Sequence, residues 1–185
     1  MATMIKTGTD VVSFLEEQHE QIREAFTEVQ AASGSERETA FYALRRLLAV
    51  HETAEEEIVH PAARRSLSNG KAVVEARLRE EHEAKKMLAA LEGMDVDSQE
   101  FERTLGELEL KVVAHAAAEE REEFAVLSVA LDQTRLESMQ KAVKLMESVA
   151  PTRPHPGVES ATANLLVGPF ASMLDRARDA LSRKS

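Results

Sequence analysis

The chain has 185 residues, a formal net charge of -10 and no cysteine. The lack of cysteine excludes disulfides, thiolate nucleophiles, iron–sulfur clusters and Cys-type zinc fingers, so histidines and carboxylates are the side chains left to bind a metal. Lys and Arg are scattered among Glu rather than clustered, which argues against a nucleic-acid partner. The longest apolar run, residues 124–131, is too short to cross a bilayer, and no early stretch resembles a signal peptide, so we expect a cytoplasmic protein with no membrane contact.

The hydrophobic pattern predicts an all-α protein, because apolar residues recur at steps of three and four and no segment alternates as a half-buried strand does. The first predicted helix begins near Asp10, and its apolar stripe is Val12, Leu15, His19, Ile22, Phe26 and Val29. After a turn at 33–35, a second helix is predicted from about 36 to 65, with the stripe Phe41, Leu44, Leu48, His51, Glu55 and Ile58. Polar residues thus occupy core positions in both helices.

Two further helices follow the turn at residues 68–70. The third ends near Glu92 and has a thinner stripe, which we assign to Val74, Leu78, His82 and Ala89. Asp97 and Glu100 are spaced as a capping box for the fourth, whose stripe is Leu105, Leu108, Val112, His115, Glu119 and Val126. Four helices with short connections predict an up-down-up-down antiparallel four-helix bundle.

The remainder of the chain predicts two additional C-terminal helices, one over about 133–149 and one after a proline-rich linker at 151–157. We therefore divide the chain into a bundle at 1–131, which holds the candidate site, and an extension at 132–185. The extension either packs on the bundle or mediates dimerisation, so both a monomer and a homodimer remain open.

An internal repeat relates the two halves of the bundle. The segment around His19 resembles the one around His82, at an offset of 63 residues. The motifs His51-x-x-x-Glu55 and His115-x-x-x-Glu119 match at an offset of 64 residues. Each half thus contributes one histidine from its first helix and a His-x-x-x-Glu motif from its second, which predicts a site with pseudo-twofold symmetry.

These polar residues are typical metal ligands. A spacing of four places His and Glu on one helix face, one turn apart. A buried carboxylate costs several kcal/mol unless it is paired or binds a metal. We therefore expect two cations, with Glu55 and Glu119 bridging them and the imidazoles as terminal ligands. The predicted ligand set is His19, His51, Glu55, His82, His115 and Glu119.

Other polar side chains are assigned to the surroundings. Glu56 and Glu120 point about 140° away from their histidines, which favours a solvated position or an indirect contact with the site. His60 lies nine residues after His51, on the opposite face of a regular helix, and is interpreted as a surface residue, as is His155 in the linker. Tyr42 is interpreted as a packing residue that would reach the site only if the helix were rotated.

The order His, His-x-x-x-Glu, His, His-x-x-x-Glu over residues 19–119 resembles the hemerythrin family, in its HHE cation-binding branch. The linker at 153–156 and the last predicted helix are similar to those of hemerythrin-like proteins of actinobacteria such as mycobacteria. The resemblance implies a non-haem centre of two iron ions, bridged by oxide or hydroxide, that reacts with peroxide, dioxygen or nitric oxide. Zinc or manganese could occupy the same ligands.

One departure from the family bears on function. Oxygen-carrying hemerythrins have a fifth histidine one turn from another on the third helix, whereas Leu78 and Lys86 flank His82 at that spacing. With two histidines per metal, both ions can keep an open position, which favours catalase-like disproportionation of hydrogen peroxide over oxygen carriage. A binding or sensing module for oxygen, nitric oxide or iron, without turnover, is the alternative. Iron storage on a ferritin-like bundle and a metal-free structural bundle rank below it.

Overall fold

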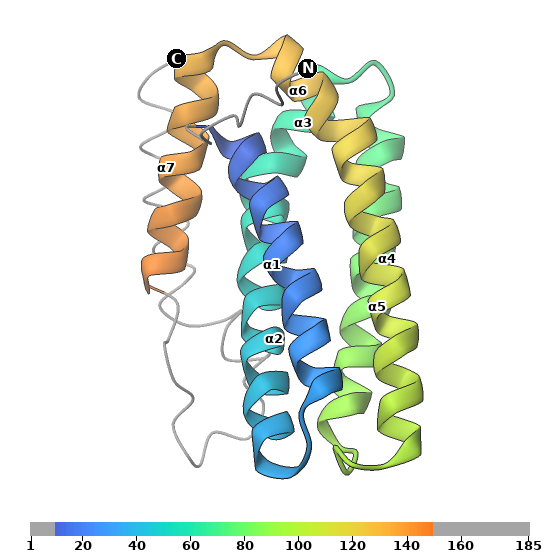
Figure 1. Ribbon diagram of the computed structural model, residues 1–185. Coiled ribbons are helices and arrows are strands. Elements are labelled where there is room, and N and C mark those ends of the chain that lie inside the picture. The colour runs from blue at the N-terminus through green and yellow to red at the C-terminus, as the bar shows by residue number, and fades with distance from the viewer. Residues whose placement is uncertain (1–9, 150–185) are drawn as a thin grey trace, which may run out of the picture.

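The computed structural model describes residues 10–149, and over this range the chain runs along the long axis of the molecule four times in alternating directions (Figure 1). The four rods form the predicted antiparallel bundle, and no strand occurs between residues 10 and 149. The first two rods begin with α1 (Val11–Ala31) and α2 (Gly34–Ala54). The other two are α4 (Gly70–Glu92) and one that begins with α5 (Gln99–Glu119).

Side-chain caps explain where two of these helices begin. The carboxylate of Asp10 accepts a hydrogen bond from the backbone N–H of Ser13 at 3.0 Å, so α1 starts where the sequence predicts. α5 differs from the prediction, because its cap is Ser98, whose hydroxyl accepts from the N–H of Phe101 at 3.1 Å. Asp97 instead accepts from the N–H of Gly34 at 3.0 Å, which joins the two loops at the same end of the bundle.

Each half of the bundle contains one π-helical turn. In the second rod, η1 (Glu55–Val59) separates α2 from α3 (His60–Ser66), and the N–H of His60 bonds to the carbonyl of Glu55. In the fourth rod, η2 (Glu120–Phe124) separates α5 from α6 (Ala125–Ala130), with an equivalent bond from Ala125 to Glu120. A π turn accommodates one extra residue and therefore rotates everything after it relative to a regular helix.

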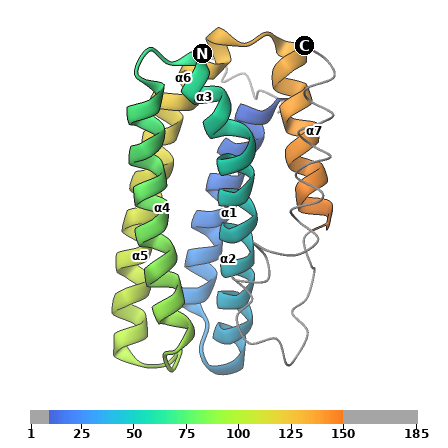
Figure 2. The same cartoon turned by 180° about the vertical axis from the view of Figure 1, so that it is seen from behind.

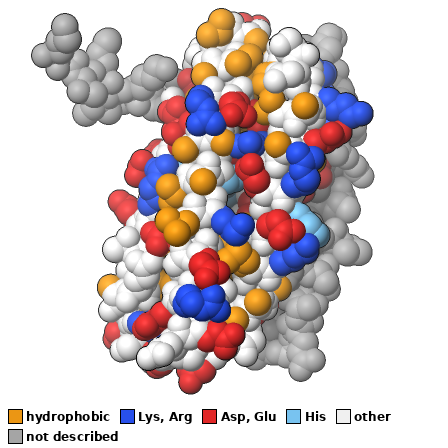
Figure 3. All heavy atoms as spheres, turned by 90° about the vertical axis from the view of Figure 1, so that its right-hand side faces the viewer, with side chains coloured by type: hydrophobic (Ala, Val, Ile, Leu, Met, Phe, Trp, Pro, Cys, Tyr) orange, Lys and Arg blue, Asp and Glu red, His pale blue; other side chains and the backbone are white. Residues whose placement is uncertain are grey.

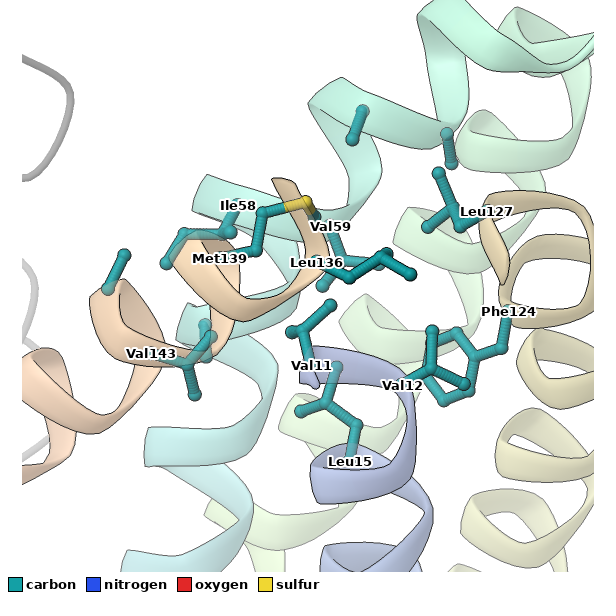
Figure 4. Close-up of a cluster of buried hydrophobic side chains, with 14 of the residues drawn as sticks. Val11, Val12, Leu15, Ile58, Val59, Phe124, Leu127, Leu136, Met139 and Val143 are labelled. Atoms are coloured by element: carbon teal, nitrogen blue, oxygen red, sulfur yellow. The ribbon is translucent and has the colours of Figure 1, made fainter. Parts of the chain in front are cut away.

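The buried apolar side chains form two clusters, one near each end of the bundle. The cluster near the loops that join α1 to α2 and α4 to α5 consists mainly of Ile22, Phe26, Val29, Phe41, Leu44, Leu48, Leu88, Leu91, Phe101, Leu105, Leu108 and Val112. The cluster at the other end includes Val11, Val12, Leu15, Ile58, Val59, Val74, Phe124, Leu127, Leu136, Met139 and Val143 (Figure 4). A layer of polar side chains lies between the two clusters.

The predicted helix at 133–149 is present as α7 (Gln133–Val149), which packs on α1, α2 and η1 beside the bundle (Figures 1 and 2). Its residues Leu136, Met139 and Val143 complete the second apolar cluster. The linker and the last predicted helix lie outside the described residues. No helix of the described chain is both long and apolar enough to cross a membrane. On the face shown in Figure 3, acidic and basic side chains are intermixed.

Candidate metal centre

The polar layer contains three overlapping groups of potential metal ligands. His19, His51, Glu55 and Glu119 place ligand atoms within 4.8 Å of one another. A second group at the same spacing consists of Glu81, His115 and Glu119, and a third of His60, Glu119 and Glu123. Glu119 belongs to all three. The structure thus brings together five of the six residues selected from the sequence, which are His19, His51, Glu55, His115 and Glu119.

Three histidines face this cluster in the same way. Nδ1 of His19 lies 2.7 Å from a carboxylate oxygen of Glu120, and Nδ1 of His115 lies 2.9 Å from one of Glu80. Nδ1 of His51 lies 3.0 Å from the amide oxygen of Gln18. An oxygen acceptor at Nδ1 favours a ring hydrogen there, so each ring turns its Nε2 into the cluster, where the deprotonated Nε2 could bind a metal. Metal-binding histidines are oriented in this way in proteins.

The Nε2 atoms meet the two carboxylates of the repeated motifs. His51 Nε2 is 3.3 Å from Glu55 Oε2, and His115 Nε2 is 3.2 Å from Glu119 Oε1. His19 Nε2 lies 3.6 Å from Glu119 and 3.9 Å from Glu55, so it contacts both motifs. Each His-x-x-x-Glu motif therefore presents its two side chains side by side, as expected for a spacing of four on a helix.

Many of the ligand atoms have no hydrogen bond within the described part of the chain. They are His19 Nε2, His115 Nε2, both carboxylate oxygens of Glu55 and of Glu119, and one oxygen each of Glu81 and Glu123. Glu55, Glu119 and Glu123 are fully buried. A buried carboxylate without a partner is costly, and a cation is the simplest partner for several at once. The donor set therefore fits a bound metal.

The two repeated glutamates differ in their electrostatic surroundings. Burial raises the pKa of Glu55 well above its usual range, and the neighbouring Glu119 raises it further. Burial alone would also raise the pKa of Glu119, but the imidazoles of His115 and His19 hold it below the usual value. Glu119 is thus the ionised carboxylate at the centre of the cluster, and the surroundings of Glu55 favour its neutral form.

The histidines are affected in opposite directions. Burial, and then the nearby His19, lowers the pKa of His51 to about 3, so His51 is neutral. Burial would also lower the pKa of His115, but Glu119 and Glu80 raise it to about 9. A cation in the cluster would displace the proton of His115 and stabilise the ionised form of Glu55.

The assignment of His82 from the sequence does not match the structure, which leaves this side chain exposed on α4. The buried side of α4 is formed by Val74, Arg77, Glu81, Ala84, Leu88 and Leu91. These residues are spaced by three and four, and His82 lies about 100° away from that stripe. Glu81, one residue earlier, is 1% exposed and takes the inward position, near His115 and Glu119.

The surface assignment of His60 is wrong, because this side chain is 2% exposed. Its Nε2 lies 2.8 Å from Glu81 and its Nδ1 lies 3.0 Å from Glu123. Burial would lower the pKa of His60, but these two carboxylates raise it to about 10. The physical reason for the error is η1, whose extra residue turns His60 by about 100° from the outer side of a regular helix toward the core.

The remaining polar candidates lie around the cluster. Glu120 is partly exposed and accepts from His19, which agrees with the indirect contact predicted for it. Glu56 forms an ion pair with Lys85, whose ammonium group also lies 3.4 Å from Glu52 and 3.5 Å from Glu81. Tyr42 is partly buried in α2. His155 lies outside the described residues.

A pocket adjoins the cluster on the side of the first apolar cluster. Its inner wall contains His19, His51, Glu81 and His115, and its aliphatic lining includes Ile22, Leu48, Ala84 and Val112. Arg23, Glu80 and Lys111 also line it, and these three are at least partly exposed. The pocket therefore places the imidazoles beside a small cavity that aliphatic side chains also line.

Comparison with known proteins finds a cation-binding family, which agrees with a cluster made of potential metal ligands. The profile of a family described as the hemerythrin HHE cation binding domain matches residues 10–127. The fold is similar to the crystal structure of a hemerythrin HHE cation binding domain-containing protein from Mycobacterium kansasii, with a TM-score of 0.65 and 18% sequence identity. That alignment covers 91% of this chain and 98% of the mycobacterial chain. No curated protein matches the chain.

Proposed function

Since this chain belongs to the hemerythrin HHE cation-binding family, we propose that its buried cluster holds two iron ions and that the loaded protein disproportionates hydrogen peroxide. The observation that supports this proposal most directly is the group of buried nitrogen and oxygen atoms that converge between the two apolar clusters without hydrogen bonds to any described residue. An iron pair, when bound, would supply the two-electron chemistry that converts two molecules of peroxide into dioxygen and two of water.

The proposal assigns ligands to two metal positions. His19, His51 and Glu55 would hold the first, and Glu81 and His115 the second, with Glu119 within reach of both. This assignment replaces His82 with Glu81. It also lowers the number of imidazoles available to the second position, because within the described chain His115 is the one histidine of that ligand group.

The low number of imidazoles favours turnover over reversible oxygen carriage. A carrier needs one metal that is fully coordinated and one that is open. Here neither ligand group contains more than two histidines, so both positions can keep a site for substrate.

The surrounding residues suit a small substrate and the movement of protons. The aliphatic lining of the pocket, with Ile22, Leu48 and Val112, restricts access to molecules of a few atoms. Glu120 and Glu80 are partly exposed and accept from Nδ1 of His19 and His115. These two hydrogen bonds connect the buried imidazoles to solvent, which gives protons a path during a reaction that first releases and then consumes them.

The test is metal analysis followed by measurement of oxygen evolution from added peroxide. We expect two irons per chain in the wild type and a loss of turnover of at least about 100-fold in His51→Ala and in His115→Ala. His82→Ala is the matched control, since His82 is exposed, and it should keep both the iron and the activity. A fully loaded wild type that evolves no oxygen would rule out the peroxide reaction, and a protein that takes up no metal would rule out the centre.

A sensing module for oxygen or nitric oxide is the second candidate, supported by the position of α7. This helix packs on η1, the turn that contains Glu55, so a shift of that carboxylate could be transmitted to the C-terminal part of the chain. Reversible changes in the optical spectrum on addition of either gas, without turnover of peroxide, would favour this candidate.

A further inference from the structure

The sequence repeat predicts two equivalent halves, but the structure makes the halves of the cluster chemically different. In the first half the inward residue before the His-x-x-x-Glu motif is a histidine, His19, and in the second half it is a carboxylate, Glu81. The group around Glu55 therefore offers two imidazoles, and the group around Glu81 offers one. Glu119 is common to both groups and does not distinguish them.

We propose that the two metal positions have different metal preferences, with the His19–His51 position binding nitrogen-preferring divalent ions first and the Glu81–His115 position selecting a harder cation. The inference rests on the proposed dimetal centre and goes beyond it. A mixed-metal centre would be the product when two such ions are supplied together.

The surroundings of Glu81 fix the orientation of its carboxylate. Its Oε1 lies 2.8 Å from Nε2 of His60, and its Oε2 lies 3.5 Å from the ammonium group of Lys85. His60 also holds Glu123, a second buried carboxylate with an unpartnered oxygen. Glu81 is thus oriented from two sides. His60 acts here as a positioning residue.

The first position has a different environment. His51 is oriented by the neutral amide of Gln18, and His19 packs against the ring of Phe124 with a centroid distance of 5.6 Å. Imidazole donors suit Co²⁺, Ni²⁺ and Zn²⁺, whereas carboxylate oxygens suit Mn²⁺ and other hard ions. The first position offers two imidazoles and the second offers one, and this difference is a physical basis for sequential metal binding.

Titration of the metal-free protein with Co²⁺, followed by its visible absorption, tests the order of binding. In the wild type we expect the first equivalent to bind at least about tenfold more tightly than the second. The one-equivalent spectrum should persist in His115→Ala and be lost in His51→Ala, because only the latter removes a ligand of the first position. His82→Ala should reproduce the wild type at both steps.

A gain-of-ligand variant tests the cause of the difference. Glu81→His gives the second position the same number of imidazoles as the first, so the ratio of the two Co²⁺ affinities should fall below its wild-type value. Circular dichroism would establish that this variant is folded.

A measurement on the wild type avoids dependence on any variant. One equivalent of Zn²⁺ followed by one of Mn²⁺ should give a magnetically isolated Mn²⁺ whose spin-echo modulation shows a single imidazole nitrogen ligand. Two imidazoles on Mn²⁺, or equal affinities for both Co²⁺ equivalents, would refute the proposed difference between the two positions but not the dimetal centre. Failure of the wild type to bind Co²⁺, Zn²⁺ or Mn²⁺ would overturn the centre itself.

Discussion

Glu55→Leu should stabilise the metal-free protein while abolishing metal binding at the first position. Glu55 is 0% exposed, and neither of its carboxylate oxygens has a hydrogen bond within the described chain. Leucine has a similar volume and no polar atom, so the substitution removes a desolvation cost without leaving a large cavity.

The size of the effect follows from the ionisation of the neighbours. Because the pKa of Glu55 is raised and that of His51 is lowered to about 3, the 3.3 Å approach between them is not a pair of charges, and its loss costs little. An unsatisfied buried carboxyl destabilises by about 1–3 kcal/mol, which is the expected gain in unfolding free energy. For a domain of this size the melting temperature should rise by about 2–4 °C per kcal/mol.

The gain should also depend on pH. Above its ordinary pKa of 4.5, Glu55 is ionised in the unfolded chain and the folded environment disfavours that charge, whereas below 4.5 the carboxyl is neutral in both states. The raised pKa therefore lowers the stability of the wild type increasingly as the pH rises above 4.5. The advantage of Glu55→Leu should accordingly be larger at pH 7 than at pH 4.

Thermal and guanidinium unfolding of chelator-treated protein, followed by circular dichroism, gives the melting temperature and the free energy of unfolding. Leu48→Ala, at a buried apolar position of α2, the helix that ends just before Glu55, is the control and should destabilise by about 2–5 kcal/mol. A metal-free Glu55→Leu protein that is less stable than the wild type would refute the reasoning, because it would mean that the carboxyl contributes a favourable interaction without metal.

Two other predictions concern proton release and helix capping. Metal binding should release protons at pH 7, because the pKa of His115 is about 9 in the metal-free protein and a ligand must be deprotonated. For one displaced proton the apparent affinity should rise up to about tenfold per pH unit until pH 9 and level off above it, and a pH-independent affinity would contradict this. Ser98→Ala should lower the unfolding free energy by about 1 kcal/mol through loss of the α5 cap, as measured by guanidinium unfolding. Asp97→Asn, which keeps an acceptor for Gly34, should change it less.

The sequence was sufficient to predict the helical bundle and most of the residues of the polar cluster, because these side chains lie on long stripes with regular spacing. The stripes of α1, α2 and α5 pass through His19, His51 and Glu119 with several apolar residues on each side, so their inward orientation follows from the helical period. The repeated His-x-x-x-Glu motif also predicts, from the sequence alone, that the second and fourth rods contribute to the same site.

Two assignments failed for separate physical reasons. On α4 the stripe could be drawn through either Glu81 or His82, and the histidine repeat favoured the wrong one, although Ala84, Leu88 and Leu91 continue the stripe of Glu81. The error at His60 had no comparable signal. A π turn depends on the packing of the whole rod rather than on a local residue preference, so the rotation that buries His60 could not be read from the spacing.

The polar layer also determines how the two ends of the bundle communicate. It interrupts what would otherwise be a continuous hydrophobic interior, so the buried apolar residues form two separate clusters, one around Phe26 and Phe101 and one around Leu15 and Leu127. In the absence of a cation, we expect each end to open at a free energy below that of the whole domain. A bound metal pair would tie four rods together at the boundary, and the domain would then unfold as a single cooperative unit.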